Sequence, residues 1–135
     1  SGKVDCPGLF NNNCPPIGPN PDDKIKHLKD YQYNICPENS KYPGYHTEKI
    51  FQALEAGCIP LYWGIDKPEF DLINNNKYCF CPIENKLLLK ENILNCIKNK
   101  DAFLSGPVFK ENAKNIIKNY YETLFQEINN KIKMN

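Results

Sequence analysis

The sequence has no apolar run near the roughly 20 residues of a membrane-spanning helix, which excludes a bilayer span within these residues. It also lacks an excess of either charge, because 17 basic and 16 acidic residues are interspersed and leave a formal charge of +1. This balance provides no basic patch for nucleic acid or for an anionic membrane. We therefore expect no nucleic-acid partner and no membrane contact in this segment. No secretory signal is present either, so the cellular compartment stays open.

The seven cysteines lack the C-x-x-C spacing that is typical of metal sites. Cys79 and Cys81 stand one residue apart in an expected strand, so their side chains would point to the same face. Cys36, Cys58 and Cys96 fall among apolar residues, where a free cysteine packs as a small hydrophobe. We predict buried thiols rather than a disulfide framework, and no metal cofactor.

With 135 residues, the chain is long enough for one domain with a real core. Residues 31–36 alternate with the period of a strand, and Ile59 to Gly64 is apolar throughout, as in a strand covered on both faces. An amphipathic helix is expected between them from about Thr47 to Ala56, with Thr47 as its cap and Gly57 as its stop. A strand, helix, strand order of this kind predicts an α/β domain with a parallel sheet.

Elsewhere the pattern predicts seven further features. Before residue 31 they are the end of a strand at residues 3–6, a loop to Pro21, and a helix from Asp22 to about Asp30 with one face that can pack on the sheet. After residue 64 they are a helical turn at 67–73, a third strand at 78–81, a helix at 87–98, and a long C-terminal helix entered at 105–107. The apolar face of the last helix is expected to pack on its own domain, with a heptad partner as the alternative. Trp63 is expected in the core.

Polar residues gather where the first strand ends and the helix begins. Glu38-Asn39-Ser40 follow the strand, at the carboxyl edge where open α/β sheets bind ligands. Tyr45, Glu48 and Lys49 cluster at the helix start, where unpaired N–H groups and the helix dipole favour an anion. A lysine is locally unfavourable there unless an anion binds, so we interpret Lys49 as a phosphate ligand. The alternatives are an ordinary polar loop for 38–40 and a capping or dipole role for Glu48.

These residues carry a family resemblance. Glu38-Asn39-Ser40 followed by Gly44-Tyr45-x-Thr47-Glu48-Lys49 resembles the signature of glycosyltransferase family 10, the α-1,3/α-1,4-fucosyltransferases, which is close to F-E-N-S and then Y-x-T-E-K. The likeness extends over nearly the whole chain. Its other parts are Val4-Asp5 with Gly8, the strand Tyr33-Asn34-Ile35, and Ala56-Gly57-x-Ile59-Pro60 leading into Tyr62-Trp63-Gly64.

The resemblance implies a two-lobed GT-B enzyme, an inverting transferase that moves fucose from GDP-fucose to a glycan hydroxyl. Residues 1–135 would then be one Rossmann-like three-layer α/β/α domain, the C-terminal half that binds the donor. The acceptor lobe, with the catalytic general base, would lie outside this chain, so that the fragment alone would be inactive. The Golgi or another glycosylation compartment would suit the full-length protein.

By motif position, the resemblance assigns the donor contacts. Lys49 would contact the diphosphate, Glu48 would hydrogen-bond sugar or ribose hydroxyls, and Tyr45 and Asn39 would line the GDP-fucose pocket, with Glu38 and Ser40 as secondary candidates. No metal is implied.

Two departures from the family stand out. Pro37 replaces an aromatic or small residue, which alters the loop shape, and the upstream arginine that the family uses on the phosphates is absent. We therefore expect that arginine to lie ahead of Ser1. Two alternatives remain: a non-catalytic module that binds a nucleotide sugar or serves in interactions, and a transferase for another GDP-sugar or a UDP-sugar.

Overall fold

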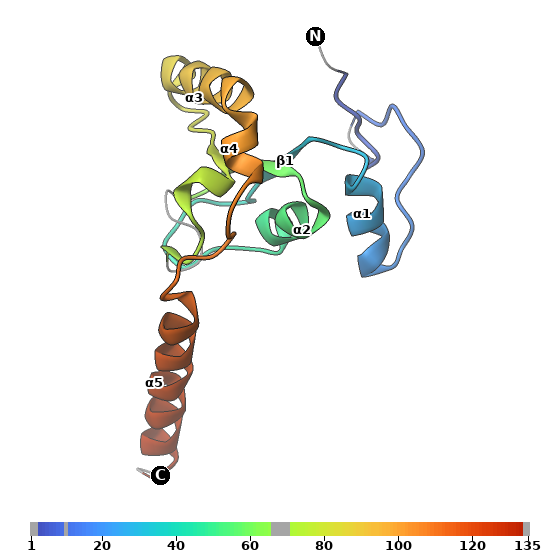
Figure 1. The fold of residues 1–135 in the computed structure, drawn as a ribbon. Coiled ribbons are helices and arrows are strands. Elements are labelled where there is room, and N and C mark those ends of the chain that lie inside the picture. Colours follow the sequence, from blue (N-terminus) through green and yellow to red (C-terminus); the bar gives the residue numbers. More distant parts are fainter. Residues whose placement is uncertain (1–2, 10, 66–70, 134–135) are drawn as a thin grey trace.

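A three-stranded parallel sheet forms the centre of the computed structural model, which describes residues 3–9, 11–65 and 71–133 (Figure 1). The strand order is β1-β2-β3, with β1 at Tyr33–Pro37, β2 at Ile59–Trp63 and β3 at Cys79–Phe80. Tyr33 pairs with Ile59, and Leu61 pairs with Cys79. The predicted α/β domain with a parallel sheet is therefore confirmed, as are the three strands.

Pro60 fits the central strand without the loss of a ladder hydrogen bond. The N–H of Ile59 donates to Gln32 O on the β1 side at 2.9 Å, so the next residue faces β3. Pairing between β2 and β3 begins only at Leu61. Proline has no backbone N–H to donate, and β3 has not yet begun beside Pro60, so no hydrogen bond of the sheet is lost there.

Helices cover both faces of the sheet. Alternate strand residues point to opposite sides, and the described core accordingly divides into two clusters. The first includes Cys36 and Tyr62 and packs against α1 (Pro21–Leu28) and α2 (Lys49–Ala56). The second includes Ile59 and Cys79 and packs against α3 (Lys86–Lys98) and α4 (Lys100–Leu104). A short 3-10 turn, η2 (Asn75–Lys77), leads into β3.

The predicted face of α2 is confirmed. Ile50 and Ala53 are fully buried, Phe51 and Leu54 pack against the same cluster, and Gly57 ends the helix in the left-handed conformation with φ +85°. A glycine is favoured there because it has no Cβ to clash in that conformation.

One N-terminal prediction is wrong. Residues 3–6 form no strand, because Asn13 takes their polar groups: its Oδ1 accepts from Cys6 N at 2.8 Å, and its Nδ2 donates to Val4 O at 2.9 Å. The predicted helix after the loop does form, as α1: it packs mainly against α2, and its Leu28 joins the core cluster that includes Cys36 and Tyr62 of the sheet. The helical turn predicted over 67–73 cannot be followed as a whole, since residues 66–70 lie outside the described residues.

The C-terminal helix differs most from expectation. α5 (Ala113–Lys133) begins well after the predicted entry, because residues 108–110 are held as an extended segment beside 72–74: Asn74 N donates to Val108 O and Lys110 N to Leu72 O, both at 2.9 Å. The helix then runs away from the rest of the domain (Figure 1). Most of its apolar residues are exposed, with Phe125 60% and Ile132 67% accessible, although Ala113 at its start is buried.

Five cysteines are buried as predicted, and all seven are free thiols. Cys79, Cys81 and Cys96 share the second core cluster. Burial raises the pKa of Cys36 and of Cys96 to about 12. Among the described residues no helix is both long and apolar enough to cross a membrane.

Candidate functional site

The predicted site residues lie at one edge of the sheet. Parallel strands bring their carboxyl ends to the same edge, so Glu38 after β1 and Gly64 after β2 become neighbours. The helix α2, which returns across the sheet, directs its N-terminus to that edge with Glu48 at the N-cap and Lys49 as the first residue. The strand-end motif and the helix-start motif therefore meet.

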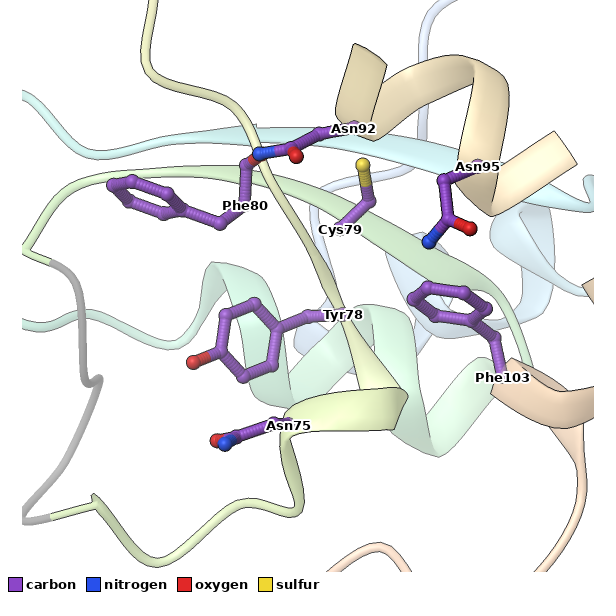
Figure 2. Close-up of a pocket in the computed structure, with 7 residues that line it drawn as sticks. All are labelled: Asn75, Tyr78, Cys79, Phe80, Asn92, Asn95 and Phe103. Atoms are coloured by element: carbon purple, nitrogen blue, oxygen red, sulfur yellow. The ribbon is translucent and has the colours of Figure 1, made fainter. Parts of the chain in front are cut away.

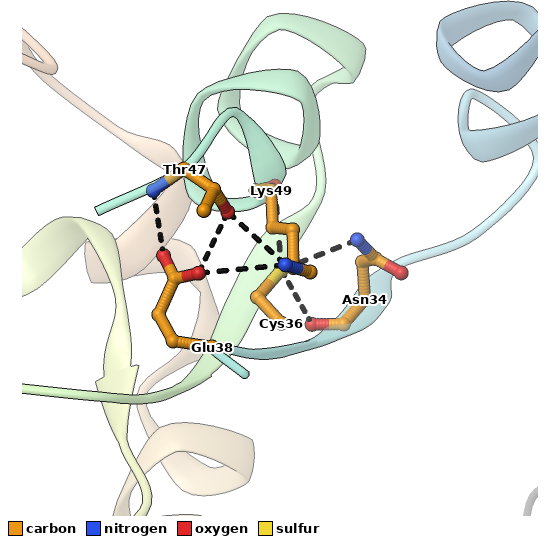
Figure 3. A network of polar contacts seen from close by, with 5 residues as sticks. All are labelled: Asn34, Cys36, Glu38, Thr47 and Lys49. Atoms are coloured by element: carbon orange, nitrogen blue, oxygen red, sulfur yellow. Dashed lines mark hydrogen bonds and ion pairs between the residues drawn. The ribbon is translucent and has the colours of Figure 1, made fainter. Parts of the chain in front are cut away.

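Glu38 is the centre of a polar network at this edge (Figure 3). Its side chain is fully buried. Oε1 accepts from Thr47 N at 3.0 Å, and Oε2 accepts from Thr47 Oγ1 at 2.6 Å. The ammonium of Lys49 lies 3.4 Å from Oε2 and also donates to Thr47 Oγ1 at 3.1 Å. A buried carboxylate needs such partners, and here each oxygen has at least one.

This network explains why a lysine is tolerated in the first turn of α2. The dipole penalty for Lys49 is offset by the adjacent Glu38 carboxylate, so a bound anion is not needed to account for this lysine. Its side chain is 22% accessible. An ammonium has three donors, of which Glu38 and Thr47 take two, so one remains for a ligand.

The N-terminus of α2 has no side-chain cap. Thr47 is therefore not the cap that the sequence predicts: its hydroxyl donates to Glu38 and accepts from Lys49 instead. The N–H groups of the first turn consequently keep their capacity to bind an anion.

Gly64 is required by the close packing beneath Glu38. A Cβ at this position would meet the ring and hydroxyl of Tyr62 and, at 3.0 Å, the Glu38 Cγ. Tyr62 is itself completely buried in the first core cluster. The residue after β2 must therefore be glycine for the carboxylate to keep its place.

The other predicted residues are more open. Asn39 is exposed and Ser40 is half-buried, both on the loop after β1. Tyr45 is half-buried, and its ring lies 4.8 Å from that of Tyr42. Glu48 is exposed at the N-cap. Each of these predicted residues lies within two positions of Glu38, Thr47 or Lys49 in the sequence.

A cavity of about 470 Å³ opens beside the start of α2. His46, Thr47 and Glu48 form one side. The opposite side is apolar and aromatic, and it comes from α2 and from the C-terminal part of the chain: Phe51, Leu72, Phe109, Ile117, Tyr120 and Tyr121. The sequence predicts none of these six as a site residue, since apolar spacing indicates only packed helix faces. The Tyr120-Tyr121 pair on a mainly polar helix is the signal available.

Trp63 also belongs to this edge rather than to the core, contrary to expectation. It is half-buried, and its indole Nε1 donates to Glu84 Oε1 at 3.2 Å. Lys41 Nζ lies 3.4 Å from the same oxygen. Glu84 also accepts a hydrogen bond from its own backbone N–H, and these contacts together hold its carboxyl pKa below the usual value.

The lysines at this edge are balanced by carboxylates. Lys41 and Lys49 face Glu38 and Glu84, with Glu48 beside them, so the described part of the site has no excess of positive charge. The whole sequence contains no arginine. Among residues 3–9, 11–65 and 71–133, no group of three or more His, Cys, Asp or Glu side chains is placed to hold a metal ion.

Comparison with known proteins identifies this arrangement. A profile described as "Glycosyltransferase family 10 (fucosyltransferase) C-term" matches residues 3–85, which contain the sheet and the whole Glu38 network. The chain belongs to glycosyltransferase family 10. The resemblance of the two motifs to this family is thereby confirmed, and residues 3–85 are part of its fucosyltransferase C-terminal domain.

Individual family members agree with this assignment. The chain is 44% identical over 48 residues to the alpha-(1,3)-fucosyltransferase FucT of Helicobacter pylori, which covers 36% of this chain and 10% of that protein. It is 31% identical over 96 residues to alpha-(1,3)-fucosyltransferase B of Drosophila melanogaster, which covers 70% of this chain and 22% of the relative.

Solved structures of alpha1,3-fucosyltransferases share the fold. A crystal structure of an alpha1,3-fucosyltransferase with GDP superposes with a TM-score of 0.58 at 29% identity, over 75% of this chain and 29% of that one. A crystal structure of an alpha1,3-fucosyltransferase with GDP-fucose gives a TM-score of 0.56 at 24% identity, over 87% of this chain and 38% of that one. At this identity the comparison supports the shared fold and nothing more. The chain thus spans well under half of each of these relatives.

Proposed function

We propose that this chain is the donor-binding domain of an inverting fucosyltransferase that transfers fucose from GDP-fucose to a glycan hydroxyl. The carrying observation is the uncapped N-terminus of α2 beside Lys49, at the carboxyl edge of a parallel sheet, inside the family match. Such an edge is the usual ligand site of open α/β sheets, and a helix N-terminus favours a diphosphate. The family-10 relative solved with GDP supports the choice of nucleotide.

In this proposal Lys49 contacts the diphosphate with its remaining N–H donor. Leaving-group charge on the diphosphate grows as the glycosidic bond breaks, and a fixed ammonium with a helix N-terminus stabilises that charge. Glu38, fully buried against Lys49 and Thr47, acts by holding the ammonium in place more than by touching the donor.

The remaining predicted residues would complete the pocket around this centre. Glu48 would accept hydrogen bonds from sugar or ribose hydroxyls, for which an exposed carboxylate at the rim of the 470 Å³ cavity is suited. Asn39, Ser40 and Tyr45, on the loop between β1 and α2, would line the other side.

The fold proposal is a Rossmann-like half of a two-lobed GT-B enzyme. Residues 1–135 would form the single donor domain, and a second lobe outside them would bind the glycan acceptor and supply the general base. The family resemblance assigns the general base to that second lobe, and the residues proposed here are assigned to the donor. We therefore expect this chain alone to bind donor without transferring sugar.

Calorimetric titration of the chain tests the proposal. GDP-fucose, GDP-mannose and UDP-galactose should bind in that order of decreasing affinity. Equal affinities would favour a general nucleotide-sugar module, and a preference for the UDP-sugar would change the donor. No binding of any of the three would contradict the proposal.

A further inference from the structure

A second cavity lies away from the proposed donor site. It has a volume of about 300 Å³, near the lower end for ligand pockets. Its lining includes Asn75 and Tyr78, which precede β3, and residues of α3 and α4 (Figure 2). It therefore lies along the edge strand β3, whereas the donor site is at the carboxyl ends of β1 and β2 and beside α2.

The lining combines side-chain amides with aromatic rings. Asn92 and Asn95 from α3 contribute amides, and Phe103 from α4 contributes a ring, whereas the side chain of Phe80 packs against the first core cluster (Figure 2). None of the described residues that line this cavity is charged. Such a surface suits a ligand that is neutral, offers hydroxyl groups, and has an apolar face.

Two of the amides are oriented by hydrogen bonds at their far ends. Asn92 Nδ2 donates to Phe80 O at 2.9 Å, which leaves Asn92 Oδ1 as an acceptor. Asn95 Oδ1 accepts from Asn99 Nδ2 at 2.7 Å, which leaves Asn95 Nδ2 as a donor. One acceptor and one donor, three positions apart on α3 and so on the same face of the helix, match a pair of neighbouring sugar hydroxyls.

The aromatic wall is also held in place. Lys77 is buried, and its ammonium donates to the Phe103 carbonyl at 3.2 Å and to the Ser105 carbonyl, which fixes the end of α4. Phe103 packs against the second core cluster and is half-buried. The ring therefore offers a fixed apolar surface beside the two oriented amides, so little ordering is required when a ligand binds.

We propose that this cavity is a binding site for a neutral saccharide, separate from the donor site. A nucleotide is a poorer match, because its phosphates would find no cation among the lining residues. A single shallow site of this size predicts a millimolar affinity. This site does not depend on the proposed transferase activity.

The test is an NMR titration of the ¹⁵N-labelled chain with lactose, maltose and cellobiose, with glycerol as the control for non-specific polyol effects. Saturable shifts of the Asn92 and Asn95 side-chain amides are expected with at least one disaccharide and not with glycerol. Asn95→Ala should weaken that binding about three- to tenfold, as for one lost hydrogen bond. Asn129→Ala, an exposed asparagine on α5, should leave it unchanged.

Two results would overturn the proposal. One is the absence of saturable shifts at these amides with all three disaccharides, while the spectrum shows a folded chain. The other is binding of guanosine at the cavity without any response to the sugars, which would make it a nucleoside site. Phe103→Leu, which keeps an apolar side chain in the core, provides a second variant should Asn95→Ala disturb α3.

Discussion

Glu38 determines the geometry of the candidate site at the level of single residues. It is fully buried, and it binds both the backbone N–H and the hydroxyl of Thr47 while it pairs with Lys49. Glu38 lies next to the helix start only because of the crossover topology, since Thr47 is nine positions further along the chain. Composition and spacing therefore indicate a site at this edge but not which polar group each side chain binds.

Replacement of this carboxylate should destabilise the protein. We expect Glu38→Gln to lower the free energy of unfolding by about 1 to 3 kcal/mol, since an amide cannot accept from Thr47 and Lys49 as a charged group does. Urea denaturation measures the change. Glu55→Gln, an exposed residue of α2, is the control and should stay near the parent value. Equal stability of Glu38→Gln and the parent would contradict the network as described.

Gly64 allows a second test at this scale. Gly64→Ala should cost about 1 to 3 kcal/mol of unfolding free energy, because the added methyl group overpacks the space beside Tyr62 and Glu38. Gly8→Ala is the matched control, since a Cβ there meets nothing within 4 Å. Thermal unfolding of the two variants compares them directly, and similar melting temperatures would show that the site tolerates a Cβ.

At the level of elements, periodicity predicts which segments form helices and strands better than it predicts their neighbours. The period-2 strand of β1, the apolar β2 and the glycine stop of α2 are local signals, and all three are confirmed. α5 has an equally clear apolar face. An amphipathic pattern indicates that a helix has an apolar face, but it does not identify the element that packs against that face. In α5, Phe125 and Ile132 remain exposed.

The exposure of α5 predicts uneven protection from hydrogen exchange. Amides from Glu122 to Lys133 should exchange much faster than those of β2, because the distal half of the helix has few tertiary contacts to stabilise it. Hydrogen–deuterium exchange followed by mass spectrometry resolves the two regions. Protection of the distal half equal to that of β2 would mean that α5 is packed in solution.

For the whole molecule, the buried thiols link stability to pH. Burial raises the pKa of Cys36 and of Cys96 to about 12 and also raises that of Cys58. In the unfolded chain these thiols ionise near their ordinary pKa of about 8.5. Between these values the unfolded state binds fewer protons, so the stabilisation is present below the unfolded pKa and is lost as pH rises towards the folded one.

We therefore expect the free energy of unfolding to fall between about pH 8 and about pH 10 by up to about 1 kcal/mol per pH unit for each buried thiol. Urea denaturation in reducing buffer measures this slope. Cys36→Ala should make the slope shallower than in the parent. A free energy of unfolding that is constant or rises over this range would contradict the burial of these thiols.

The central claim, that Lys49 at the N-terminus of α2 binds the diphosphate of a GDP-sugar, is tested most directly by calorimetry with GDP. Lys49→Ala should weaken GDP binding by about 1.5 to 3 kcal/mol, the scale of a hydrogen bond to a charged group. Lys49→Gln keeps a hydrogen-bond donor near Glu38, so it is the variant to use if Lys49→Ala loses the fold, and it should weaken GDP binding as well. Lys90→Ala on α3 is the control and should bind GDP with the affinity of the parent. Affinity for GDP that is unchanged in folded Lys49→Ala and Lys49→Gln would contradict the claim.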